Sequence, residues 1–103
     1  MNFNQLKIFH TVVKKKSFSV AAKELCLTQP DVSIQMNRLE DYLGVQLLER
    51  KNLRLTDAGK ILASYAEKIF RLSLEAENVI ADYRSLDQGT LKIHAVAAMS
   101  TWC

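Results

Sequence analysis

The first half of the chain carries apolar side chains at the three- and four-residue spacing of an amphipathic helix. In the first such stretch the apolar positions are Leu6, Phe9, Val12 and Val13. This spacing predicts a helix over residues 4–15, and the lysines at its end suit the negative end of a helix dipole. A short second helix is expected up to residue 25, with Ser17 or Ser19 as its N-cap.

A third helix has the clearest boundaries. Thr28 and Asp31 have the spacing of a capping signal, and Pro30 is tolerated in a first turn. Gly44 can take the left-handed conformation that ends a helix. The apolar stripe comprises Val32, Met36, Leu39 and Leu43. At 100° per residue, the side away from the core holds Pro30, Ser33, Ile34, Asn37 and Asp41.

A hairpin and a long helix are expected after the third helix. Residues 47–50 and 53–56 have the pattern of two short strands. A single helix should then run from Ala58 to about Leu86, because this segment contains no proline and no glycine after Gly59. Thr56 or Asp57 is the expected cap of that helix.

The long helix carries an apolar stripe with the spacing of a coiled coil. Its members, which we assign to dimerisation, are Leu62, Tyr65, Ile69, Leu72, Ala76, Val79, Tyr83 and Leu86. Such a helix is roughly 40 Å long at about 1.5 Å per residue. The small domain formed by residues 1–58, which we call the head, is therefore too short to cover the whole stripe. We therefore expect self-association, with Ile61 and Phe70 packing against the head.

The pattern changes to alternation near the end of the chain. Leu91, Ile93 and Ala95 alternate with polar residues, which predicts the start of a strand. One strand has no sheet to join, so residues 88–103 are expected to begin a truncated further domain.

Composition narrows the class of protein. The chain of 103 residues is 49% hydrophobic, which suits one small folded domain. Residues 1–58 contain nine Lys and Arg against six Asp and Glu, whereas residues 59–103 contain five of each, so the basic excess lies in the N-terminal half. The two cysteines have no metal-ligand spacing, and no stretch is typical of a signal peptide or membrane span, so we expect a cytoplasmic protein without metal or cofactor.

The order of elements predicts a mainly α fold, a winged helix-turn-helix of three helices and a β-hairpin wing followed by a long dimerisation helix. The helix-turn-helix itself should occupy about residues 18–37. In this fold the third helix enters the major groove of DNA and the hairpin reaches beside it. The sequence shows no carboxylate pair, nucleophile with a base or phosphate-binding glycine loop, so no catalytic residue and no enzymatic activity are expected.

The same region also resembles a known family. The matching segments are Ser17-Phe18-Ser19, Ala21-Ala22, Leu25, Thr28-Gln29-Pro30, Val32-Ser33, Arg38-Leu39-Glu40, Leu43-Gly44-Val45, Leu47-Leu48-Glu49-Arg50 and Leu55-Thr56-Asp57-Ala58-Gly59. Together they resemble the N-terminal domain of LysR-type transcriptional regulators, over residues 1 to about 98. The resemblance implies a DNA-binding domain at 1–58, a linker helix at 59–87, and the start of an effector-binding domain at 88–103.

The resemblance implies a homodimer, or a tetramer in a full-length form, that binds double-stranded promoter DNA. A small-molecule effector would bind only through the absent C-terminal domain. Expected groove contacts are Gln29, Pro30, Ser33, Ile34, Asn37 and Arg54. Expected phosphate contacts are Lys16, Ser17, Lys23, Thr28, Arg38, Arg50 and Lys51.

Two departures from the family pattern affect these assignments. Position 34 is commonly arginine in the family, whereas Ile34 offers an apolar group suited to a thymine methyl. The wing is about two residues shorter than usual, so either Arg54 or Lys51 could reach the minor groove, and we favour Arg54. Two alternatives stay open: another winged-helix class, such as the LysR-like head of a molybdate-responsive regulator, and a coiled-coil adaptor that does not bind DNA.

Overall fold

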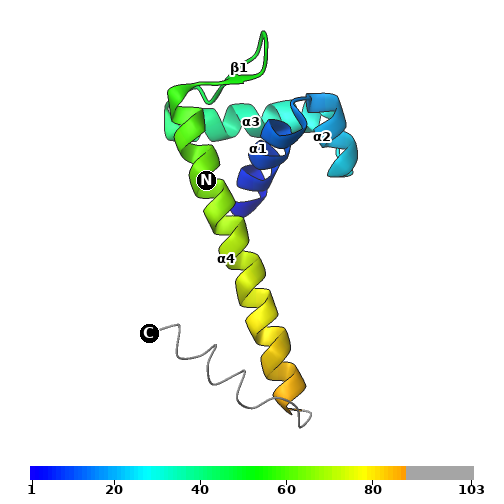
Figure 1. Ribbon diagram of the computed structural model, residues 1–103. Helices are drawn as coiled ribbons and strands as arrows, with labels where there is room; N and C mark the ends of the chain where they lie inside the picture. Colours follow the sequence, from blue (N-terminus) through cyan, green and yellow to red (C-terminus); the bar gives the residue numbers. More distant parts are fainter. Residues whose placement is uncertain (88–103) are drawn as a thin grey trace. The chain divides into compact units, whose positions relative to one another are not determined.

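The computed structural model describes residues 1–87 (Figure 1). The described residues divide into two units, Met1–Glu67 and a second one that begins at Lys68. The elements are α1 (Phe3–Lys15), α2 (Phe18–Glu24), α3 (Gln29–Leu43), β1 (Leu48–Glu49), β2 (Arg54–Leu55) and α4 (Asp57–Asp87). The three helices, the hairpin and the start of α4 make up the first unit, which confirms the expected mainly α, winged helix-turn-helix order. The strand expected at residues 91–95 lies outside the described residues.

Local side-chain bonds set the beginnings of α1 and α2. Asn2 caps α1 by accepting a hydrogen bond from the Gln5 amide at 2.7 Å, which starts the helix one residue earlier than predicted. Lys16 ends α1 in the left-handed conformation. The Ser17 hydroxyl accepts from the Val20 amide at 3.1 Å, so Ser17 is the cap of α2, as one of the two expected alternatives had it.

The boundaries of α3 are confirmed at both ends. The Asp31 amide donates to the Thr28 hydroxyl at 3.2 Å, and the Thr28 amide donates to the Asp31 carboxylate at 3.3 Å. This reciprocal pair is a capping box. At the other end Gly44 has a φ of 73°, the left-handed conformation that its lack of a Cβ allows.

The core of the first unit lies where α1, α2, α3 and the hairpin meet. Its buried members are Ile8, Phe9, Val12, Ala21, Ala22, Val32, Met36, Leu39, Leu47 and Leu48. Most of the apolar positions predicted for α1 and α3 are therefore core residues. Leu43 is different: it is the last residue of α3, directly before the turn at Gly44, and it is exposed.

The hairpin is confirmed, but its strands are shorter than predicted. Leu48 pairs with Leu55 and Glu49 pairs with Arg54 in an antiparallel register. Leu53 has a φ of 54°, a left-handed conformation that does not fit an extended strand, so β2 begins only at the next residue, Arg54. Each strand is consequently only two residues long. We call residues 48–55 the wing.

The wing and α4 join at a close backbone contact. The Thr56 hydroxyl accepts from the Gly59 amide at 3.0 Å and donates to the Gln46 carbonyl at 2.6 Å, so Thr56 has the capping role at the start of α4. A Cβ added to Gly59 would lie 2.1 Å from the Leu47 carbonyl oxygen. Glycine is required here because only hydrogen fits between the two backbones.

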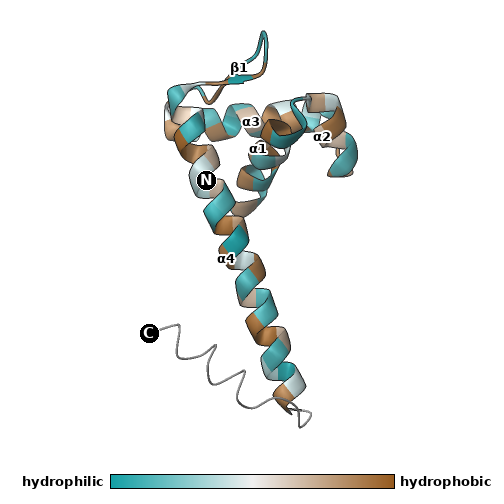
Figure 2. Cartoon of the chain, in the orientation of Figure 1, coloured by the Kyte–Doolittle hydropathy of each residue, from teal (hydrophilic) through white to brown (hydrophobic). Residues whose placement is uncertain are grey.

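The face of α4 that packs on the core differs in part from the prediction. Leu62 and Ala63 pack against the core, and Ala66 is fully buried. Ile61 was expected to pack against the head, and this was wrong, because its side chain is 61% exposed. Leu62 packs there instead, although the sequence pattern placed it in the dimerisation stripe. Apolar and polar residues alternate along the rest of α4 (Figure 2). Within residues 1–87, no helix has the length and apolar character needed to cross a membrane.

Candidate nucleic-acid interface

The first turns of α3 present the candidate groove contacts at the surface. The side chains of Pro30, Ile34 and Asn37 are exposed, as the 100° projection predicted, and Gln29 at the start of the helix is exposed as well. Ile34 is 47% exposed, which is high for a large apolar residue on a helix that has Val32 and Met36 fully buried. Ser33 is half-buried on the same part of the helix. Four of the six expected groove contacts therefore share an accessible surface on one element.

The N-terminus of α3 has fewer free donors than its sequence suggests. In the capping box the Thr28 and Asp31 backbone amides donate to the Asp31 carboxylate and the Thr28 hydroxyl, so these two donors already have partners within the chain. Gln35, on the inner side of the helix, accepts a hydrogen bond from Gln5 of α1 at 3.3 Å. Thr28 remains exposed, but its first role in the structure is to start the helix.

Several expected phosphate contacts are exposed cations. Lys16 ends α1, Lys23 lies in α2, Arg38 lies in α3 and Lys51 lies in the wing. The ion pairs found within residues 1–87 involve none of these four side chains. Their charges are therefore exposed to solvent and accessible to an anion. Lys15, in contrast, pairs with Glu24 at 3.3 Å.

Arg50 is engaged within the molecule, which the sequence did not indicate. It forms an ion pair with Glu40, and its Nη2 also donates to the Asn37 Oδ1 at 3.0 Å. Its Nη1 donates to the Leu48 carbonyl at 3.2 Å, and the guanidinium carbon lies 5.6 Å from the centre of the Phe18 ring. Arg50 was expected to contact phosphate, which stays a prediction, and the structure shows that it also connects the wing to α3.

The wing carries the remaining groove candidate, Arg54. Its side chain is exposed, and its amide donates to the Asn52 Oδ1 at 3.2 Å, which orders the tip of the wing. Arg54 lines a hollow of about 480 Å³ together with Val13, Lys16, Asn52, Leu53, Leu55 and Lys60. Three of these residues are cationic. Lys60 was not among the sequence candidates, because only the packing of α4 beside the wing brings it near Lys16 and Arg54.

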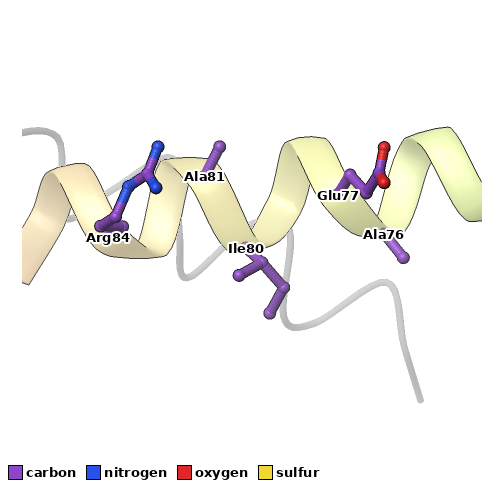
Figure 3. A pocket seen from close by; sticks show the side chains of 5 residues that line it. All are labelled: Ala76, Glu77, Ile80, Ala81 and Arg84. Carbon is purple, nitrogen blue, oxygen red and sulfur yellow. The ribbon is translucent and has the colours of Figure 1, made fainter.

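The candidate dimerisation residues lie on α4. Tyr65, Leu72 and Tyr83 are exposed, and Leu72 is 62% exposed. Ile80, which is not in the predicted stripe, is also exposed. Figure 3 shows Ala76, Glu77, Ile80, Ala81 and Arg84 on the second half of α4. These five residues line a hollow along α4.

Among residues 1–87 the one histidine is His10. Partial burial and the nearby positive charge of Lys14 hold the pKa of His10 below its usual value, and the carboxylate of Glu67 opposes that change. In the part of the chain from 1 to 87, no group of three or more His, Cys, Asp or Glu side chains could hold a metal ion. His94 lies outside the described residues.

Comparison with protein families gives a match over most of the first unit. Residues 3–60 match the family described as bacterial regulatory helix-turn-helix protein, lysR family. A RuBisCO operon transcriptional regulator of Allochromatium vinosum is 38% identical over 100 residues, which cover 95% of this chain and 33% of that protein. A probable RuBisCO transcriptional regulator of Chlorokybus atmophyticus is 40% identical over 101 residues, covering 96% of this chain and 32% of the relative. The chain thus spans about a third of the length of these relatives.

Solved structures give the same picture. The BenM DBD in a complex with catB site 1 DNA has a TM-score of 0.79 at 32% identity, covering 88% of this chain and all of that one. Full-length CbnR complexed with its target DNA has a TM-score of 0.73 at 37% identity, over 86% of this chain and 29% of that one. Both similar structures therefore contain DNA.

Proposed function

The chain belongs to the LysR family of bacterial regulatory helix-turn-helix proteins, and we propose that it binds promoter DNA as a sequence-specific transcriptional regulator. The observation that carries this proposal is the exposed surface of α3, with Gln29, Pro30, Ile34 and Asn37 accessible at its first turns. A recognition helix needs exposed side chains that can reach base edges in the major groove, and an amide such as that of Gln29 is one suitable group. The family and its DNA-bound structural relatives favour this function over a coiled-coil adaptor.

The exposed residues divide into reading and positioning contacts. Gln29 can pair with both the N6 and N7 of adenine, a bidentate contact that distinguishes one base from the others. Lys16, Lys23 and Lys51 carry exposed charges that would contact phosphates, which sets affinity without reading sequence. Arg54 is the candidate for the minor groove, where a narrow A/T-rich segment concentrates negative potential.

The same proposal includes a homodimer formed through α4. The helix exposes Tyr65, Leu72 and Tyr83 along its length, and apolar side chains at this spacing bury well against a second helix. Two copies would then place two α3 helices on DNA at half-sites about one helical turn apart, roughly 34 Å, or a multiple of that spacing. A regulator of this kind would act in the bacterial cytoplasm.

Selection of bound duplexes from a random pool tests the function, followed by titration of two variants at several salt concentrations. Gln29→Ala should cost about 1–3 kcal/mol for the selected site and relax the preference at one base pair. Lys16→Ala should weaken binding to all sequences alike and lower the salt slope by about one.

Three results would contradict these assignments. If the pool shows no sequence enrichment, the chain is not a sequence-specific regulator. If the chain has no affinity for duplex DNA at low salt, the adaptor alternative regains support. An equal, sequence-independent loss in both variants would show that α3 is not the reading element.

A further inference from the structure

The carboxylate of Glu40 in α3 accepts hydrogen bonds from two backbone amides at the point where the wing begins. Its Oε2 accepts a hydrogen bond from the Leu47 amide at 2.7 Å and another from the Leu48 amide at 3.3 Å. The Glu40 side chain is only 12% exposed, so these bonds form with little competition from water. A charged acceptor makes stronger hydrogen bonds than a neutral one. The first residues of the wing are therefore fixed to α3 by charge-assisted bonds.

The other end of β1 is held by the same carboxylate. Arg50 follows β1 directly, and its guanidinium pairs with Glu40 while its Nη1 donates back to the Leu48 carbonyl. Because Glu49 pairs with Arg54 across the hairpin, a fixed β1 also fixes the position of β2. The place of Arg54 relative to α3 thus depends on Glu40.

Arg50 also determines which group Asn37 can offer to DNA. A guanidinium is a donor only, so the atom of Asn37 that faces the Arg50 Nη2 at 3.0 Å must be the carbonyl oxygen. The amide nitrogen, which has two donor hydrogens, is the group left for another partner. The oxygen of Asn37 has already given one of its two lone pairs to Arg50, so the nitrogen is the group with its full capacity left for DNA. It can donate to a phosphate oxygen or to a base acceptor.

We propose that Glu40 is a positioning residue for DNA binding. Through the Leu47 and Leu48 amides it sets the distance between the wing and α3, and through Arg50 it holds Asn37 as a hydrogen-bond donor. This inference rests on the proposed DNA-binding function. Arg50 acts in it as a link within the molecule, a role that the sequence did not predict.

A double-mutant cycle on the full chain tests the wing part of the proposal. The affinity for the selected duplex is measured for wild type, Arg54→Ala, Glu40→Gln and the double variant. We expect Arg54→Ala to lower affinity about tenfold in the wild type but less than about twofold in the Glu40→Gln background, because an unanchored wing no longer places Arg54. Lys16→Ala should cost the same in both backgrounds, since Lys16 is not on the wing.

Asp41→Asn is the matched control. It removes the same charge from the next position of α3, where the side chain is exposed, so the cost of Arg54→Ala should stay about tenfold in that background. Circular dichroism and thermal unfolding establish that each variant is folded. If Glu40→Gln does not fold, Arg50→Lys serves in the same cycle, since lysine keeps the charge but lacks the planar fork that joins Glu40 and Asn37.

The amide orientation has its own readout. Asn37→Asp replaces the donor nitrogen by an acceptor oxygen while still accepting from Arg50, so it should weaken binding about tenfold or more. Unchanged binding by Asn37→Asp would overturn the donor assignment. Equal costs of Arg54→Ala in the wild-type and Glu40→Gln backgrounds would overturn the positioning role, and so would a wild-type cost below about twofold. If the wild type binds no duplex DNA at all, the proposed function itself fails, which is a different result from either of these.

Discussion

Ile34 places an exposed apolar side chain on the candidate reading surface of α3. Its side chain is 47% exposed on α3, and Asn37, three residues later, is exposed as well. An exposed aliphatic group in a major groove has one apolar partner among the base edges, the thymine methyl. We therefore expect one thymine of the selected site to contact Ile34 through its methyl group.

Replacing that thymine by uracil removes only the methyl. Affinity should fall about fourfold, since a buried methyl group is worth about 0.8 kcal/mol. Ile34→Ala should bind the thymine and uracil duplexes equally. Tyr42→Ala is the control, because Tyr42 is 71% exposed at the far end of α3 and should leave the uracil effect intact. Uniform tolerance of uracil at every thymine of the site would refute the contact.

At the level of single residues, the sequence predicted which side chains are exposed better than it predicted which side chains bond to one another. Helical periodicity alone placed Pro30, Ile34 and Asn37 on the accessible side of α3, because it depends only on the geometry of one helix. The role of Arg50 could not be predicted in this way. Its bonds to Glu40 and Asn37 join residues that are ten and thirteen positions apart, and they form only once the hairpin has folded back against α3. No local spacing rule reports such a contact.

At the level of elements, the capping residues made the helix boundaries predictable from the sequence, whereas the strand boundaries have no such signal. The capping box at Thr28 and the left-handed Gly44 bound α3 where the sequence placed them. The wing has no comparable signal. Its second strand begins after the left-handed Leu53, and its first strand is held by the bonds from the Leu47 and Leu48 amides to the Glu40 carboxylate. Those bonds form only once the hairpin lies against α3.

The junction between the wing and α4 gives a prediction at this scale. Gly59→Ala should destabilise the fold by about 1–3 kcal/mol, because the new Cβ would lie 2.1 Å from the Leu47 carbonyl oxygen and backbone must shift. The ordinary helix preference for alanine, about 1 kcal/mol, acts in the opposite direction. Urea unfolding followed by circular dichroism measures the difference.

Ser64→Ala provides the comparison for that measurement. Ser64 is exposed on the same helix, so the substitution should be neutral or slightly stabilising. If Gly59→Ala proved as stable as wild type, the close approach of α4 to Leu47 would be wrong, and with it the anchoring of the wing at its C-terminal end.

At the scale of the whole molecule, the long helix was predictable but the division of its faces was not. The sequence stripe combined residues that serve two different purposes. Leu62 packs on the core of the first unit, whereas Leu72 and Tyr83 are exposed farther along α4. Periodicity predicts that a face is apolar but not what it packs against. Only the folded structure shows which residues of that face pack on the core of the same chain and which are left exposed.

Because Leu72 is exposed on α4 and does not pack on the core, a substitution there tests self-association without disturbing the first unit. Leu72→Asp should convert the proposed dimer to a monomer at micromolar concentration, because each copy would lose the burial of a leucine, worth about 1.5–3 kcal/mol, and would place a charge in an apolar interface. Asn78→Asp adds the same charge at an exposed polar position of α4 and should leave the dimer unchanged.

Analytical ultracentrifugation of the three proteins, followed by titration with duplexes carrying one or two half-sites, separates assembly from DNA binding. Wild type and Asn78→Asp should bind the two-site duplex much more tightly than the one-site duplex, since a dimer engages both half-sites in one event. Leu72→Asp should bind both duplexes with similar, weak affinity, because its head is intact but unpaired. A monomeric wild type, or a Leu72→Asp variant with unchanged mass, would remove α4 as the dimerisation element while leaving the role of α3 open to its own test.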